Sequence, residues 1–178
     1  EKRGLPNLKT TPDALPALVT EKSFKLFEKY GVLSKIEMES RFNVRCEKYA
    51  TDLEIEAKCM TNIVNTYVIP SAIKYQKELA ISIEETKDLI GDSDGIAEQI
   101  EMLKSIVSLI GKVKKGVDEL KALYEVGHPE EEIKLAEYFG NKVKPKMEAL
   151  REDVDALEEI VDDELWSMPK FWEMLFIN

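Results

Sequence analysis

The chain has 178 residues, of which 44% are hydrophobic and 34% are charged, and its formal net charge is −10. This balance is typical of a soluble protein with a substantial core and excludes a largely disordered chain. The acidic charge and the lack of clustered lysines and arginines exclude a nucleic-acid-binding surface. No apolar run reaches the roughly 20 residues that span a bilayer, and no signal-peptide core is present. We therefore predict a cytoplasmic protein that contacts neither membranes nor nucleic acids.

The first twenty residues are rich in proline, with Pro6, Pro12 and Pro16. This spacing predicts a linker over residues 1–20 that leads from an upstream domain and holds at most one helical turn, with Thr11 as its N-cap. The chain begins at Glu1 rather than at methionine, which favours a fragment of a longer protein. We expect residues 21–178 to form one helical bundle domain.

A short helix and a long one follow the linker. Thr20 can cap a helix over residues 21–30 that stops at Gly31. Ser34 and Glu37 have the spacing of a capping box and open a helical pattern that continues to about Ile90. Proline lacks the backbone donor and clashes with the preceding turn, so Pro70 predicts a kink near Val68 and Ile69.

Two further helical patterns complete the chain. Apolar residues repeat every three or four positions over residues 96–124, where Gly111 and Gly116 can allow another helix to approach closely. A similar stripe covers residues 130–163, with a second kink at Pro145. Short turns and no strand pattern predict an all-α fold: an up-and-down antiparallel bundle of three long kinked helices, a short N-terminal helix and an aromatic C-terminal tail.

The sequence offers little catalytic chemistry. The one histidine, His128, lies in a predicted turn with no neighbour to orient it, and Cys46 and Cys59 are too far apart along one helix for a disulfide or a zinc site. No glycine loop of a phosphate-binding kind occurs, and Asp92 and Asp94 do not complete a calcium loop. The residues therefore predict no catalytic, cofactor-binding or metal-binding site, and favour a scaffold or interaction domain.

Acidic residues are concentrated before the tail. Between Glu148 and Glu164 there are nine carboxylates and one cation, Arg151. Such a run forms either a solvated helix face or a surface for divalent cations or a basic partner. Both interpretations stay open at this point.

The C-terminal tail carries the strongest interaction signal. Large aromatic side chains at a chain end reduce solubility unless they are buried. We therefore predict that this tail docks against the bundle or against a neighbouring subunit through five residues: Trp166, Phe171, Trp172, Leu175 and Phe176.

Several segments resemble, in order, the region that follows the catalytic core in type III glutamine synthetases. They are Leu5-Pro-Asn, Thr11-Pro-Asp-Ala-Leu-Pro, Leu26-Phe-Glu-Lys-Tyr-Gly-Val, Glu37-Met-Glu-Ser-Arg, Ile69-Pro-Ser-Ala, Met147-Glu-Ala-Leu-Arg and the tail from Trp166 to Phe176. The resemblance covers essentially the whole chain and thins between residues 89 and 140. In the tail, Phe171-Trp172-Glu173 stands where the family usually has tyrosine, glycine and aspartate.

The resemblance implies a parent enzyme that joins ammonia to glutamate with ATP and Mg²⁺ or Mn²⁺ in a large ring-shaped homo-oligomer. None of that family's metal or ATP motifs occurs in this chain, so we expect it to be inactive alone and to hold no cofactor. Its partners would be its own catalytic domain and neighbouring subunits, and its role would be to support the core or subunit assembly. The alternative is a stand-alone helical adaptor that binds a partner protein.

Overall fold

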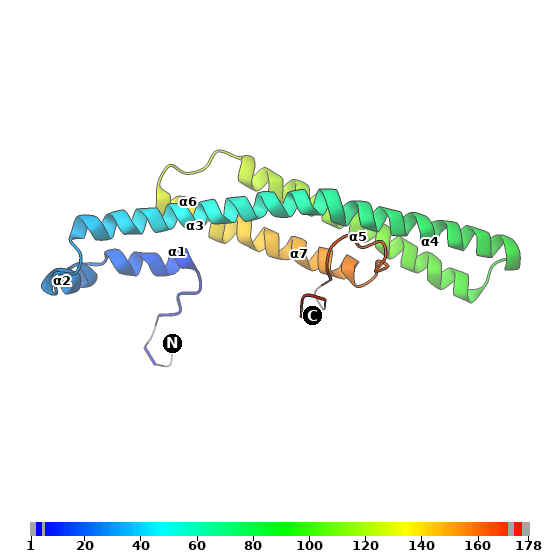
Figure 1. Ribbon diagram of the computed structural model, residues 1–178, viewed down its shortest axis with the longest axis horizontal. Coiled ribbons are helices and arrows are strands. Elements are labelled where there is room, and N and C mark those ends of the chain that lie inside the picture. Colours follow the sequence, from blue (N-terminus) through cyan, green and yellow to red (C-terminus); the bar gives the residue numbers. More distant parts are fainter. Residues whose placement is uncertain (1–2, 5, 171–172, 176–178) are drawn as a thin grey trace. The chain divides into compact units, whose positions relative to one another are not determined.

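The computed structural model describes residues 3–4, 6–170 and 173–175, and these residues form helices and loops without any strand. The N-terminal elements are helix α1 (Thr11–Ala14), a 3-10 turn (Leu15–Val19) and α2 (Glu21–Lys29). Figure 1 shows the elements in chain order. The later elements are α3 (Lys35–Ile63), a π-helical segment (Val64–Val68), α4 (Ile69–Ile90), α5 (Asp94–Glu125), α6 (Glu132–Tyr138), a second π-helical segment (Phe139–Val143), α7 (Lys144–Glu158) and a 3-10 turn (Glu173–Leu175).

This order confirms the predicted all-α fold of three long helical runs, over residues 35–90, 94–125 and 132–158. The prediction for the last run was wrong at its C-terminal end, because α7 stops at Glu158 and not near residue 163. The Val161 amide still donates a helical hydrogen bond to the Leu157 carbonyl, at 2.9 Å. The chain then turns, so the carboxylates that follow Glu158 are not part of the helix.

Both predicted kinks coincide with π-helical segments. Each segment ends two residues before a proline, at Val68 before Pro70 and at Val143 before Pro145. Proline cannot donate, and its ring clashes with the carbonyl four residues earlier. A wider turn accommodates this clash: the Ile69 amide bonds to the Val64 carbonyl, five residues back. The hydrogen-bond register therefore widens before each proline, and the α-helix resumes immediately.

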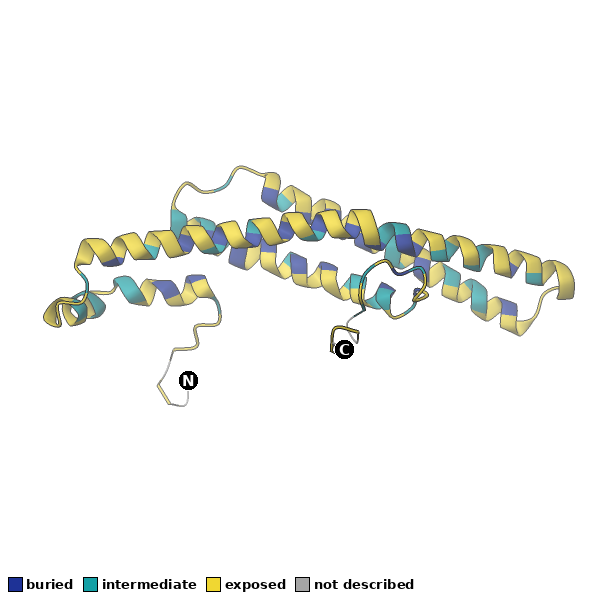
Figure 2. Ribbon diagram, in the orientation of Figure 1, coloured by how far each residue is buried: buried dark blue, intermediate teal, exposed yellow. Residues whose placement is uncertain are grey.

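The described residues divide into two compact units. The first comprises residues 1–57 and 123–145, and the second comprises residues 58–122 and 146–178. The boundaries between them fall within α3, α5 and α7. In Figure 2 the buried residues appear as separate dark-blue stretches of ribbon along these helices. No helix in the described ranges is long and apolar enough to cross a membrane.

The first unit has a small core that includes the residues before α2. Leu15, Cys46 and Ala136 are buried together, and three further side chains pack against them: Phe42, Tyr49 and Ile133. Residues 11–19, within the range interpreted as a linker, are thus helical and partly buried. The cap of α1 is Thr10, whose hydroxyl accepts from the Asp13 amide at 3.3 Å, so the assignment of Thr11 as N-cap was wrong by one residue.

In the second unit α5 and α7 pack antiparallel. A Cβ atom at Gly116 would lie 3.1 Å from Leu150 Cδ1, so the missing side chain lets α7 approach. One turn further along α5, Glu119 forms an ion pair with Lys146, which lowers the pKa of the Glu119 carboxyl. The prediction of close approach is confirmed at Gly116 and wrong at Gly111, where a Cβ atom would meet nothing within 4 Å.

The predicted capping box opens α3. The Ser34 amide donates to Glu37 Oε2 at 2.7 Å, and the Glu37 amide donates to Ser34 Oγ at 3.3 Å. The hydrogen bond from the Ser34 backbone, followed by that from its hydroxyl, lowers the pKa of Glu37 below its usual value. The box is therefore strongest when Glu37 is ionised.

We expect this cap to weaken in acid. A carboxyl whose pKa is lowered by folding stabilises the fold above its unfolded pKa, about 4.3, and this contribution is lost as the pH falls through the lowered value. Glu37→Gln keeps the hydrogen-bonding shape but does not titrate. Thermal unfolding measured from pH 7 to pH 2.5 should show a shallower pH dependence in Glu37→Gln than in wild type, and parallel curves would contradict this account.

Candidate docking segment

The described residues after Val161, which are 162–170 and 173–175, form a turn and then an irregular segment, and are here called the docking segment. Asp162 organises the turn: its side chain accepts from the Glu164 amide at 2.7 Å and its carbonyl accepts from the Trp166 amide at 3.0 Å. Aspartate commonly bonds in this way to the backbone that follows it. The chain therefore turns before it reaches Pro169.

The indole of Trp166 is the anchor of the segment. Only 7% of its surface is exposed, and it lies in the second unit together with buried Val161. Its Nε1 is also buried and has no hydrogen-bond acceptor. Burial of an indole gains roughly 2 to 3 kcal/mol of apolar transfer free energy, while one buried donor without an acceptor costs about 1 to 3 kcal/mol. The Trp166 side chain is thus held by apolar packing, and its backbone amide by the Asp162 carbonyl.

Two polar contacts hold the chain on either side of Pro169. The hydroxyls of Ser167 and Ser71 lie 3.1 Å apart, and Ser71 is buried in the first turn of α4. Lys170 Nζ donates to the Val161 carbonyl at 3.1 Å and pairs with Asp163. A lysine is favourable here because the carbonyls at a helix end carry partial negative charge. These contacts fix the docking segment against its own unit.

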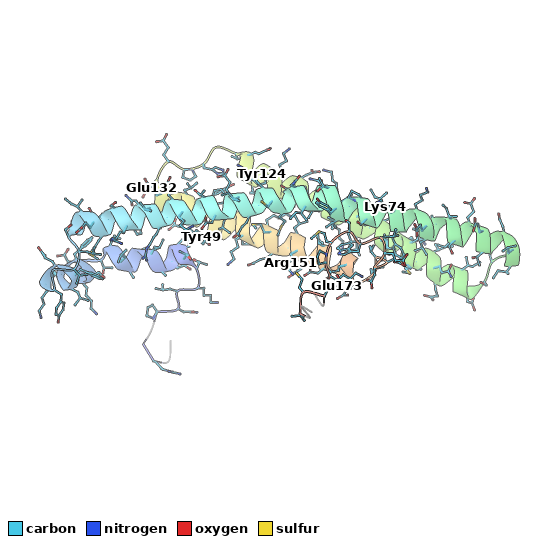
Figure 3. All side chains as sticks on the ribbon, viewed as in Figure 1. Tyr49, Lys74, Tyr124, Glu132, Arg151 and Glu173 are labelled. Atoms are coloured by element: carbon cyan, nitrogen blue, oxygen red, sulfur yellow. The ribbon has the colours of Figure 1, made fainter. Side chains whose placement is uncertain are left out.

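Past Lys170 the segment presents apolar side chains to solvent. The Lys170 amide donates to the carboxylate of Glu173 at 2.8 Å, and Glu173 begins the last 3-10 turn (Figure 3). Met174 and Leu175 in that turn are exposed, Leu175 by 65%. Phe171, Trp172 and Phe176 lie outside the described residues. Docking by Phe171, Trp172, Leu175 and Phe176 thus stays a prediction.

Sequence reasoning missed Ser71, Ser167 and Lys170. The two serines are 96 positions apart, and nothing in the pattern of either segment links them. Lys170 did carry a signal, since it is the first cation after the acidic run that begins at Glu148. A lone basic residue just after a helix end is a common partner for the last carbonyls.

The histidine is better ordered than the sequence predicts. His128 Nε2 lies 3.1 Å from the Tyr124 carbonyl, and the ring contacts Tyr138 and Phe139 at centroid distances of 5.3 and 5.1 Å. The interpretation that nothing orients His128 was therefore wrong. Its Nδ1 is buried without a partner, and neither contact supplies the nucleophile that a catalytic histidine would serve.

The remaining candidates have structural surroundings. Cys46 is buried in the first unit, and burial, followed by the charges of Glu132 and Glu137, raises the pKa of its thiol. Cys59 is exposed on α3, and both cysteines are free thiols. Within residues 3–4, 6–170 and 173–175, no three histidine, cysteine or acidic side chains are grouped to hold a metal ion. In the acidic run, Arg151 pairs with Asp155 across one turn.

Comparison with known proteins shows which family and which relatives this chain is similar to. Residues 1–87 match the family described as the glutamine synthetase C-terminal domain. Over its whole length the chain is 33% identical to the type-3 glutamine synthetase of Dictyostelium discoideum. It is 30% identical to a glutamine synthetase of Butyrivibrio fibrisolvens and 26% identical to one of Bacteroides fragilis, with 98% of the chain covered in each.

The chain spans 25% of the length of each of these relatives. The matched family accounts for the N-terminal elements as far as α4, and the longer relatives extend the similarity through α5, α7 and the docking segment. The helical architecture and the order of the resembling segments agree with both findings. The chain therefore matches the glutamine synthetase C-terminal domain over its first 87 residues and is similar to a type-3 glutamine synthetase over its whole length.

Proposed function

We propose that this chain is a non-catalytic domain that supports the assembly of a cytoplasmic glutamine synthetase, and that the docking segment is the part that reaches a partner. The partner is the catalytic domain of the same enzyme or of a neighbouring subunit in a ring-shaped homo-oligomer. The parent enzyme would carry out the ATP-dependent ligation of ammonia to glutamate. ATP and Mg²⁺ or Mn²⁺ would belong to its catalytic domain.

One observation carries the proposal: the docking segment is fixed at one end and exposed at the other. Trp166, Ser167 and Lys170 hold it against the second unit, while Met174 and Leu175 face solvent. These contacts hold the tail in one position, so its last side chains are presented to a partner at a defined place on the unit. Pre-positioning of this kind lowers the entropy lost on binding.

The sequence supports the non-catalytic part of the proposal. The chain has one histidine and no glycine loop that could cradle ATP phosphates. A domain with these properties contributes surface rather than chemistry. The relatives share the name of the enzyme, and their additional length provides room for the catalytic part.

The test uses the full-length parent enzyme. Deletion of residues 167–178, and separately the double change Met174→Ser with Leu175→Ser, should lower the assembled mass in mass photometry while the melting temperature of the subunit changes little. The exposed pair Val44→Ser with Ile55→Ser on α3 is the matched control and should leave the mass unchanged. An unchanged mass in both tail variants would refute the role in assembly. Glutamine synthesis by the purified 178-residue chain would refute the non-catalytic role.

A further inference from the structure

The hairpin between α4 and α5 exposes apolar side chains in an acidic setting. This tip, defined as residues 81–102, holds seven carboxylates and one cation, Lys87, which is paired with Asp92 at 2.8 Å. Leu89 and Ile90, the last residues of α4, are adjacent and exposed, Leu89 by 85%. Figure 2 shows most of this end of α4 and α5 as exposed. Large aliphatic side chains rimmed by charge are a mark of interaction sites.

The α2 region of the first unit has the opposite charge. Residues 21–36, here called the basic face, contain four lysines and two glutamates. On α2, Lys22, Leu26 and Lys29 follow spacings of four and three, so they share one side of the helix, and Tyr30 is the C-cap that follows. The exposed apolar side chains of this region are Leu26, Tyr30, Val32 and Ile36.

Part of the basic face is pre-ordered by its own side chains. Lys29 Nζ lies 5.6 Å from the Tyr30 ring centroid, and Lys35 Nζ lies 5.1 Å from that of Phe24. A lysine that rests on an aromatic ring keeps its charge while its stem covers apolar surface. Lys25 is paired with Glu21 and Lys35 with Glu39, so Lys22 and Lys29 supply the positive charge that the basic face offers beside its apolar side chains.

We infer that the acidic tip of one copy of this chain docks on the basic face of a second copy. The occupant is a second copy because the same chain carries both the acidic apolar surface and its basic apolar counterpart. Such a contact joins two different surfaces, so each added copy leaves one of each free, and the series ends only if it closes into a ring. The inference uses residues 21–36 and 81–102 and is independent of the docking segment.

Sedimentation velocity of the 178-residue chain tests this directly. At low salt the weight-average mass should rise above the 20.4 kDa of one chain as the concentration is raised. It should fall again at about 0.5 M salt, where charges are screened beyond a few ångströms. A chain that stays monomeric at every concentration would overturn the inference. This holds if the two surfaces contact each other within one copy, and also if they make no contact.

Charge reversal gives the sharper experiment. The tip variant Glu85→Lys with Asp88→Lys, and the face variant Lys22→Glu with Lys29→Glu, should each weaken association roughly tenfold or more. An equimolar mixture of the two variants should regain it, because each reversed surface then meets an opposite one. A mixture no heavier than its components would overturn the inference.

Two matched controls separate this contact from a general effect of charge or polarity. Glu152→Lys with Glu159→Lys raises the net charge by four, from −10 to −6, as the tip variant does, and should leave association unchanged. Leu89→Ser with Ile90→Ser should weaken association, whereas Val107→Ser, at another exposed aliphatic position, should not. Equal weakening by the controls would overturn the inference. Circular dichroism of each variant verifies that the helices are intact.

Discussion

Replacement of Trp166 by alanine is expected to lower the free energy of unfolding by about 3 to 5 kcal/mol, the range for buried aromatic residues. The indole is 7% exposed and is the one large aromatic anchor among the described residues of the docking segment. Trp166 Nε1 has no acceptor, so the alanine variant loses no hydrogen bond from the indole. The loss is therefore one of packing and apolar burial.

Trp166→Phe is the matched control for this reading. Phenylalanine keeps most of the apolar contact and removes the buried donor that lacks a partner, so we expect a loss of about 1 kcal/mol or less. Chemical denaturation of wild type and both variants measures the two differences. Equal midpoints for wild type and Trp166→Ala would show that the indole does not stabilise the unit. A larger loss in Trp166→Phe than in Trp166→Ala would contradict the packing account.

The parts of the fold that depend on neighbouring residues could be predicted from the sequence. The capping box of Ser34 and Glu37 spans three residues, and the stop at Gly31 needs only a positive φ, which is 62°. The positions of Pro70 and Pro145 also marked the two places where the helical hydrogen-bond register changes. Each of these features is decided within one or two helical turns, so the local pattern contains its cause.

Other features could not be predicted, for identifiable physical reasons. Ile160 and Val161 continue the apolar stripe of α7, so the apolar pattern gives no sign of the turn at Asp162. The π-helical segments shift the hydrogen-bond register without changing which residues are apolar. The contact between Ser71 and Ser167 joins residues 96 positions apart, and serine alone carries no signal of its partner.

The same limit applies to the candidate site. The apolar character of the tail pointed to Trp166, but the pattern gave no reason to separate an anchored half from an exposed half. That division comes from Lys170, which reaches back to the Val161 carbonyl and Asp163. The turn and the contacts of Lys170 thus place Trp166 and Leu175 in different surroundings, a difference that hydropathy alone does not predict.

The second large effect is expected at Phe139, where alanine should cost about 3 to 5 kcal/mol of unfolding free energy. Its side chain is 1% exposed, and its ring lies 5.1 Å from the His128 ring and 5.8 Å, edge to face, from the Tyr138 ring. Phe139 also opens the second π-helical segment, where its carbonyl accepts from the Lys144 amide. Removal of the ring would leave a cavity beside a backbone segment that has π-helical hydrogen bonds.

Tyr138→Phe provides the comparison at the neighbouring position. It deletes only the hydroxyl that donates to the Leu123 carbonyl at 2.9 Å, so the expected loss is about 1 kcal/mol. Chemical denaturation gives both losses, and amide hydrogen exchange over residues 139–143 locates them. Faster exchange in this segment for Phe139→Ala but not for Tyr138→Phe would show that the buried ring, rather than the hydroxyl, holds the π-helical turn. Similar losses in the two variants would assign the stability to the hydrogen bond instead.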